Sequence, residues 1–179
     1  MSLKDRNRRT AVKCLAAMAA ATAVPFRSVF ASEQRDLAFY HTHTRMKLSI
    51  VYAADGEYIA RALDRINVFL ADFRSGGIKR IDPRLLDLIY DIRESLGSNG
   101  TYEVISAYRS PETNALLRVK SSGVAKKSQH MLGNAIDVRL SDVKTSELRD
   151  AALAMKRGGV GYYKDSDFVH IDIGRVRRW

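Results

Sequence analysis

Histidine and aspartate residues in the second half of this chain have the spacing of a metal site. Of four histidines, two stand near carboxylates: His130 precedes Asp137, and His170 follows Asp167. Two histidines and one carboxylate are the smallest set that holds a catalytic zinc ion and leaves one coordination position for water. His130 and Asp137 converge if the chain turns at Gly133 and re-enters as a strand. His170 then has to reach them from a neighbouring strand.

Two other interpretations of these residues stay open at this point. In the first, His130 is a loop histidine, His170 is a half-buried strand residue, and no metal is bound. In the second, two histidines and a carboxylate form the facial triad of a non-haem iron oxygenase. In those oxygenases, however, the His-x-Asp pair precedes a distant histidine, whereas in this chain His170-x-Asp172 comes last. The pair His41 and His43 has no acid nearby, and we interpret both as surface residues of a strand.

Hydrophobic spacing predicts the elements that position these residues. Alternation in Leu37–His41 and Leu48–Tyr52 predicts a β-hairpin. Apolar residues every three or four positions predict a helix within Glu57–Arg74, and a second helix from the capping residue Asp82 to Gly97. Further along we expect strands at Tyr102–Tyr108, Ala135–Leu140, Gly161–Tyr163 and Phe168–Ile173, and helices at Pro111–Val119 and Ser146–Met155. Without a regular βαβ rhythm, this order predicts an α+β fold with a mainly antiparallel sheet and helices packed on it.

The N-terminus has the composition of an export signal rather than of a fold. It opens with five basic residues and one acid, continues with the apolar stretch Cys14–Val24, and reaches a small-x-small sequence that ends at Ala31. The pair Arg8-Arg9 predicts the twin-arginine route. An uncleaved amphipathic anchor helix is the alternative. We therefore expect a signal at 1–31, a single domain at 32–179 and a periplasmic location.

Charge and cysteine content limit the partners of the mature domain. The net charge of +10 falls to +5 once residues 1–31 are removed, because six of 30 bases and one of 20 acids leave with them. The remaining charge fits attraction to an anionic polymer and is too diffuse to indicate nucleic-acid binding. The only cysteine, Cys14, leaves too, so the domain is indifferent to an oxidising compartment. No mature segment is long and apolar enough to span a membrane, and we expect a monomer.

A longer motif resembles the D-alanyl-D-alanine-type zinc peptidases, which include VanX-like dipeptidases and phage endolysins with a hedgehog-type fold. Ser-x-His-x-x-Gly-x-Ala-x-Asp runs from Ser128 to Asp137, and Asp-x-x-His ends at His170. Ile105–Pro111 resembles the Tyr-Arg segment of the same family, and three further segments resemble its periplasmic murein endopeptidases: Gly123–Ser128, Gly158–Tyr163 and Arg178-Trp179. The resemblance spans essentially all of residues 37–179.

The resemblance implies a role for each matching residue. It implies three ligands for one zinc ion per chain: His130, Asp137 and His170. Asp167 would be the general base on the zinc-bound water, Arg109 would face the oxygen that gains negative charge, and Ser128 would help to position the substrate. Asp172 lies two residues after His170, hence on the same face of a strand, and we expect it to support the ligand histidine rather than to bind metal.

The function implied is that of a zinc-dependent murein endopeptidase that hydrolyses peptide cross-links between peptidoglycan stem peptides. Modest basicity is compatible with the anionic carboxylates of those peptides. Two alternatives stay open within the same fold: a catalytically inert, zinc-containing peptidoglycan-binding module, and a D,D-carboxypeptidase acting on stem peptides. The sequence leaves open which bond is cut.

Overall fold

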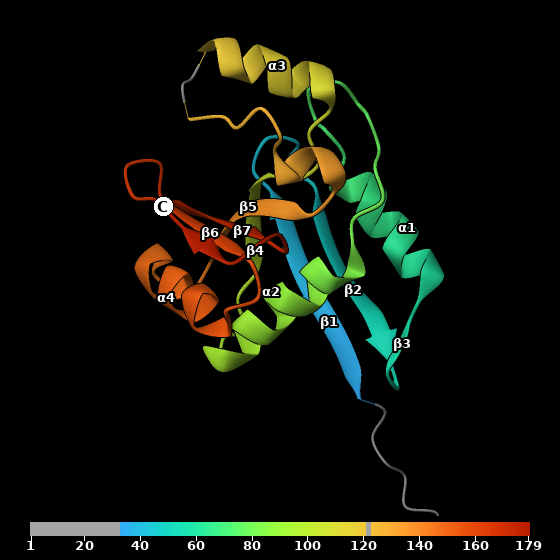
Figure 1. The fold of residues 1–179 in the computed structure, drawn as a ribbon. Coiled ribbons are helices and arrows are strands. Elements are labelled where there is room, and N and C mark those ends of the chain that lie inside the picture. Colours follow the sequence, from blue (N-terminus) through green and yellow to red (C-terminus); the bar gives the residue numbers. More distant parts are fainter. Residues whose placement is uncertain (1–32, 121–122) are drawn as a thin grey trace, which may run out of the picture. The chain divides into compact units, whose positions relative to one another are not determined.

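The computed structural model describes residues 33–120 and 123–179, so the predicted export signal lies outside the described residues. Within these ranges, one mixed sheet has the strand order β3-β2-β1-β4-β5-β7-β6-β8 (Figure 1). The strands are β1 Gln34–His41, β2 Lys47–Ala54, β3 Glu57–Tyr58, β4 Tyr102–Ser106, β5 Ala135–Leu140, β6 Gly159–Tyr163, β7 Phe168–Asp172 and β8 Arg177–Arg178. Only β1/β4 and β6/β8 pair in parallel, which confirms the predicted mainly antiparallel sheet.

The first helix is shorter than its apolar spacing predicts. Helix α1 covers Ala60–Phe69, not Glu57–Arg74, because Glu57–Tyr58 pairs with β2 as strand β3. Helix α2, Pro83–Ser95, begins as predicted, with the Asp82 carboxylate accepting a hydrogen bond from the Arg84 amide at 3.0 Å. Local capping chemistry therefore predicted a helix boundary better than periodicity did.

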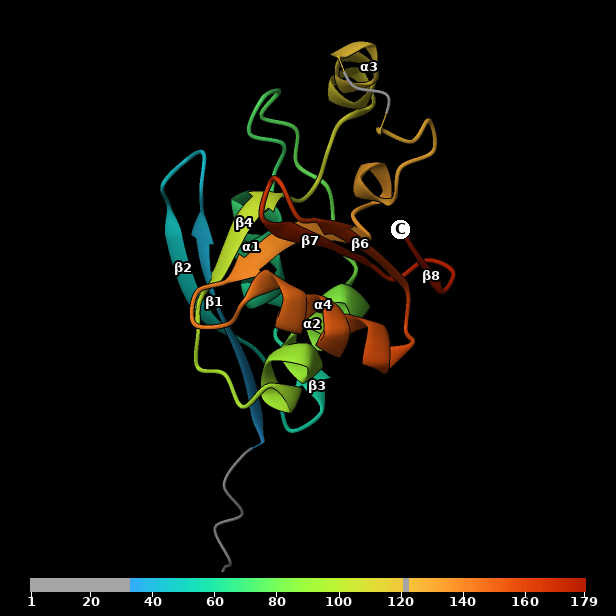
Figure 2. The ribbon, with the colours of Figure 1, turned by 90° about the vertical axis from the view of Figure 1, so that its left-hand side faces the viewer.

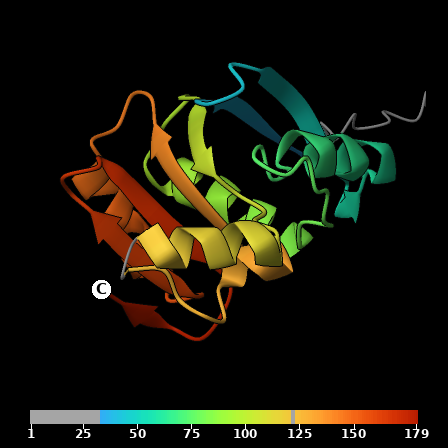
Figure 3. The ribbon, with the colours of Figure 1, turned by 90° about the horizontal axis from the view of Figure 1, so that it is seen from above.

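Helices lie on both sides of the sheet. Helix α4, Thr145–Met155, packs against α2 and the strands β5, β6 and β7, whereas α3, Pro111–Lys120, stands beyond the opposite face (Figure 2). Seen from above, α3 lies over the C-terminal strands (Figure 3). A single 3₁₀ turn, η1 Gln129–Leu132, precedes β5. None of the helices in the described ranges has the length and apolarity needed to cross a bilayer.

Strands β5 and β7 alternate between the core and the opposite face of the sheet. Val138 and Val169, paired across the two strands, join the hydrophobic core with Leu148 of α4. The neighbouring pair, Asp137 and His170, therefore projects to the other face, because successive strand residues point to opposite sides. The core thus fixes the strands that carry the polar pair without containing that pair.

Candidate metal centre

Three buried side chains from η1, β5 and β7 converge on one point. His130 Nε2 lies 3.1 Å from His170 Nδ1 and 3.2 Å from Asp137 Oδ1, and the last two atoms are 2.8 Å apart. Gly133, with φ of 75°, ends η1 in the left-handed region and turns the chain into β5, as predicted. Three residues distant in sequence thus present one ligand atom each to a common centre.

The outer hydrogen bonds of both imidazoles leave their inner nitrogens available to a cation. His130 Nδ1 donates to Ala107 O at 2.6 Å, and His170 Nε2 donates to Asp172 Oδ2 at 2.8 Å. When both imidazoles are neutral, each inner nitrogen therefore presents a lone pair toward the centre that it shares with Asp137. Tetrahedral zinc bonds of about 2.0–2.1 Å place neighbouring ligand atoms about 3.3 Å apart, close to the separations observed. The residues present fit a zinc ion.

Protonation in the absence of metal follows the same contacts. Burial opposes a charge on His170, but its hydrogen bonds to Asp137 and Asp172 outweigh burial and raise its pKa to about 9. Burial lowers the pKa of His130. Without metal, a proton on His170 Nδ1 therefore lies between this nitrogen and Asp137 Oδ1, in the region where a metal cation would be bound.

Asp172 lies on the face of His170, as its spacing predicts. It is fully buried, and its carboxylate accepts hydrogen bonds from the guanidinium of Arg177 at 3.0 and 2.6 Å and from the amides of Gly159 and Gly174. Burial by itself raises the pKa of Asp172, but the bonds from His170 and Arg177 hold it below the usual range. This carboxylate is therefore ionised and fixes the orientation of the His170 ring.

Arg109 faces the centre with hydrogen-bonding capacity to spare. Its Nη2 lies 3.7 Å from Asp137 Oδ2, and its buried Nε has no hydrogen-bond partner within the described residues. The backbone holds it there, because the Arg109 amide donates to His130 O at 3.3 Å. Burial lowers the pKa of its guanidinium, Asp137 raises it and Arg74 lowers it. The side chain is placed to meet negative charge beside the metal ligands.

The Ser128 hydroxyl caps the turn that carries His130. It accepts a hydrogen bond from the His130 amide at 3.3 Å, and the residue also lines the cleft. The structure therefore shows a capping contact, while substrate positioning stays a prediction.

Asp167 is not brought to the centre. It closes the β6–β7 turn with φ of 51°, and its carboxylate accepts a hydrogen bond from the Thr145 hydroxyl at 2.6 Å, at the start of α4. Arg139 Nη1 lies 3.5 Å from its other oxygen. These residues line a separate cavity that shares no residue with the cleft at the metal centre. The geometry thus separates Asp167 from the ligands, and its role as general base stays a prediction.

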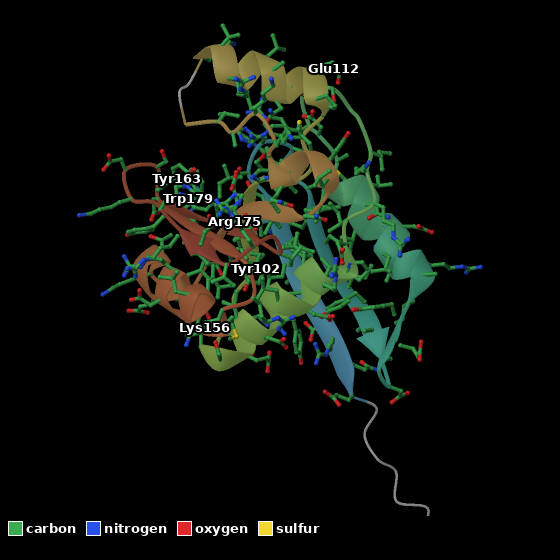
Figure 4. All side chains as sticks on the ribbon, viewed as in Figure 1. Tyr102, Glu112, Lys156, Tyr163, Arg175 and Trp179 are labelled. Atoms are coloured by element: carbon green, nitrogen blue, oxygen red, sulfur yellow. The ribbon has the colours of Figure 1, made fainter. Side chains whose placement is uncertain are left out.

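A cleft of about 390 Å³ lies over the three ligands. Its lining includes His43, Arg74, Tyr163, Arg177 and Trp179. Trp179 Nε1 donates to the Tyr163 hydroxyl at 3.0 Å, and both side chains are labelled in Figure 4. Strand β8 brings Trp179 over Gly161, where a Cβ atom would lie 2.6 Å from the indole. No local signal in the sequence indicates this long-range packing.

The interpretation of His41 as a surface residue is wrong. Its side chain is 1 % exposed, with its ring 6.1 Å from Phe69 and 5.4 Å from Phe73. It continues the buried alternation of Leu37 and Phe39 to the end of β1. His43, two residues later in the turn, is exposed and lines the cleft.

Comparison with known proteins agrees with this site. The family Peptidase_M15_2, described as Peptidoglycan L,D-endopeptidase MepK, matches residues 29–179. A relative from Escherichia coli (strain K12), Peptidoglycan L,D-endopeptidase MepK, is 39 % identical over 178 residues, 98 % of each chain. Another from Haemophilus influenzae, Probable peptidoglycan L,D-endopeptidase MepK, is 38 % identical over 146 residues, 81 % of this chain and 78 % of the relative.

Proposed function

The chain belongs to the Peptidase_M15_2 family, and on that premise we propose that it is a zinc-dependent murein endopeptidase that hydrolyses peptide cross-links of peptidoglycan. The observation that carries the proposal is the convergence of His130 Nε2, His170 Nδ1 and Asp137 Oδ1 at 2.8 to 3.2 Å, each histidine with its other nitrogen bound elsewhere. A histidine cluster with only a structural role does not require that both outer ring nitrogens be hydrogen-bonded so that both inner nitrogens remain available to a cation.

The chemistry divides between the ion and the chain. Zinc held by His130, Asp137 and His170 would supply Lewis-acid activation of a water molecule and of the scissile carbonyl. The Arg109 guanidinium, whose Nη2 lies 3.7 Å from Asp137 Oδ2, stabilises the negative charge that develops on the carbonyl oxygen. Asp172 keeps the His170 ring in the tautomer that presents Nδ1, and Ser128 keeps η1 and hence His130 in place. The role of Asp167 as general base stays a prediction from the resemblance, since its carboxylate contacts Thr145 and Arg139 here rather than the three converging side chains.

Two features favour an endopeptidase over the alternatives. An inert binding module does not require a buried guanidinium beside Asp137, and a carboxypeptidase needs room on only one side of the scissile bond. In strand order the cleft runs from His43 after β1, past the ligands on β5 and β7, to Trp179 after β8. Space on both sides of the metal centre suits a cross-link whose two stem peptides extend in opposite directions.

Metal analysis combined with digestion of purified murein tests the proposal. We expect one zinc per chain and release of cross-link cleavage products, identified by mass, that stops on chelation and returns when zinc is restored. The cooperative unfolding transition should survive chelation, because the core lies on the opposite face of β5 and β7 from the ligands. Murein binding without fragment release would support the inert module, and release of free D-alanine alone would support the carboxypeptidase.

We further propose that residues 1–31 direct export to the periplasm by the twin-arginine route, and that the exported domain is a monomer. The basic pair Arg8-Arg9 before an apolar stretch supports the route. Replacing both arginines by lysine should trap the precursor inside the cell, as measured by fractionation. Normal periplasmic recovery would remove the twin-arginine assignment, and sedimentation of the exported protein tests the oligomeric state.

A further inference from the structure

One end of the cleft carries a positive charge that no part of the proposed mechanism uses. Arg74, from the loop between α1 and α2, lines this end together with His43, Ile105 and Ser106. Ile105 and Ser106 belong to β4, the neighbour of the ligand-bearing strand β5. Arg74 thus lies beside the metal centre, on the side away from Trp179.

The Arg74 guanidinium is held in a layered arrangement. Its carbon lies 4.1 Å from the centre of the Phe73 ring, and that ring stacks on His43 with centroids 4.1 Å apart and an interplanar angle of 13°. Asp72 holds the loop in place, because its buried carboxylate accepts hydrogen bonds from the Arg74 amide at 3.0 Å and from the Ser110 amide at 2.9 Å. Such packing limits the motion of an otherwise flexible side chain, so little entropy remains to be lost on binding.

This guanidinium has no carboxylate partner among the residues that the structure describes. The contrast with the other arginines of the cleft is direct: Arg177 is bound through two nitrogens to Asp172, and Arg109 faces Asp137. Burial and, after it, the nearby charge of Arg74 lower the pKa of His43. Asp137 is the only carboxylate among the described residues that line the cleft. This end of the cleft is therefore complementary to an anion.

We propose that Arg74 binds a free carboxylate of the stem peptide next to the scissile bond and so determines specificity for substrates that carry it. The inference rests on the proposed function, because a cross-linked stem peptide places carboxylates on either side of the bond to be cut. A guanidinium fixed at the cleft wall recognises a carboxylate by paired, charge-assisted hydrogen bonds. A substrate amidated at that position loses the charge and leaves the guanidinium unpaired.

The test compares cross-linked muropeptides that differ by one amide. Each of the two carboxylates that flank the scissile bond is amidated in turn, and kcat and KM are measured for the zinc-loaded enzyme. At one of the two positions, amidation should lower kcat/KM of the wild type about 10- to 100-fold, the range for a hydrogen bond to a charged group. Arg74→Met keeps packing on Phe73 but removes the charge, and should reduce this preference to within about 2-fold.

Several readouts separate recognition from a structural role. Arg74→Met should raise KM for the free-acid substrate with kcat within about 2-fold, and should leave kcat/KM for the amidated substrate unchanged. Arg74→Lys, which retains the charge without the fork, should show an intermediate preference. Arg84→Met serves as the matched control, because Arg84 is exposed, pairs with Asp82 and does not line the cleft. It should retain the wild-type preference.

Failure of this inference can be told apart from failure of the proposed function. If wild type cleaves all substrates equally, or Arg74→Met retains the preference, the assignment of Arg74 is overturned while the endopeptidase stands. If wild type cleaves none, the proposed function fails. Binding of the same peptides to chelated protein, measured by calorimetry, then decides the inference alone: preference for the free acid that Arg74→Met abolishes supports it, and equal binding refutes it.

Discussion

Two aspartates stand near His170, and the structure gives them opposite environments. Asp172, two residues after the histidine, is 0 % exposed and accepts hydrogen bonds from His170, Arg177 and two glycine amides. Asp167, three residues before it, has a side chain 60 % exposed that accepts a bond from Thr145 and lies 3.5 Å from Arg139.

The difference follows from the geometry of a strand. Residues two apart in a strand project to the same face, so Asp172 follows His170, whereas Asp167 lies before β7 in the β6–β7 turn, where its φ of 51° breaks the alternation. A buried carboxylate is stable only when donors surround it, and β8 and two tight glycine contacts supply them to Asp172. The comparison teaches that nearness in sequence to His170 does not distinguish a carboxylate that bonds to its ring from a peripheral one.

Removing the histidine between the two aspartates should have the largest effect. His170→Ala deletes one of three ligands and leaves Asp137 and His130 without their partner. We expect loss of the metal and a fall in cleavage rate of about 10³-fold or more. Zinc content and murein digestion measure both. Full metal occupancy in this variant would mean that the three residues are not the metal site.

The next effect should come from the buried aspartate. Asp172→Asn keeps the shape of the side chain. It replaces one of the two carboxylate oxygens, which accept hydrogen bonds from Arg177 and His170, with an amide NH₂ group that can only donate. We expect zinc affinity to fall about 10- to 100-fold and the free energy of unfolding to drop by about 3 kcal/mol. Competition with a calibrated chelator and denaturant titration measure the two quantities. An unchanged zinc affinity would show that Asp172 only stabilises the fold.

A smaller effect should follow when the arginine that binds Asp172 is replaced. Arg177→Met leaves Asp172 with its bonds from His170 and the glycine amides, so the His170 ring keeps its orientation. The lost charge-assisted bonds should lower the free energy of unfolding by about 1.5 kcal/mol, with zinc affinity within about 10-fold of wild type. A loss of affinity as large as in Asp172→Asn would place Arg177, not Asp172, as the residue that controls the ring.

The smallest effect should come from the exposed aspartate. Asp167→Asn retains an acceptor for Thr145, Asn tolerates a positive φ, and solvent screens the contact with Arg139. We expect cleavage within about 2-fold of wild type and a change in unfolding free energy within about 0.5 kcal/mol.

The same variant decides between the structure and the family resemblance. If Asp167 is the general base, the cleavage rate of Asp167→Asn should fall about 10²- to 10⁴-fold while zinc is retained. The β6–β7 turn must then rearrange when substrate binds. Loss of zinc from Asp167→Asn would instead make Asp167 a ligand.

Features that depend on a few neighbouring residues were predictable from the sequence. The cap at Asp82, the turn at Gly133 and strand β5 are local, because hydrogen bonds and side-chain alternation within a short segment decide them. The spacing within Ser128–Asp137 and the resemblance that it carries identified the three ligand candidates and the peptidase family, and the structure brings those three side chains together.

Tertiary structure alone decided which other side chains meet them. Three contacts join segments that are distant in the sequence: Asp167 lies against α4, the Arg177 guanidinium of β8 binds Asp172, and Phe73 packs on His43. The packing of the whole core determines each of these contacts, because its free energy outweighs local conformational preference. Periodicity and spacing within a segment therefore do not predict them.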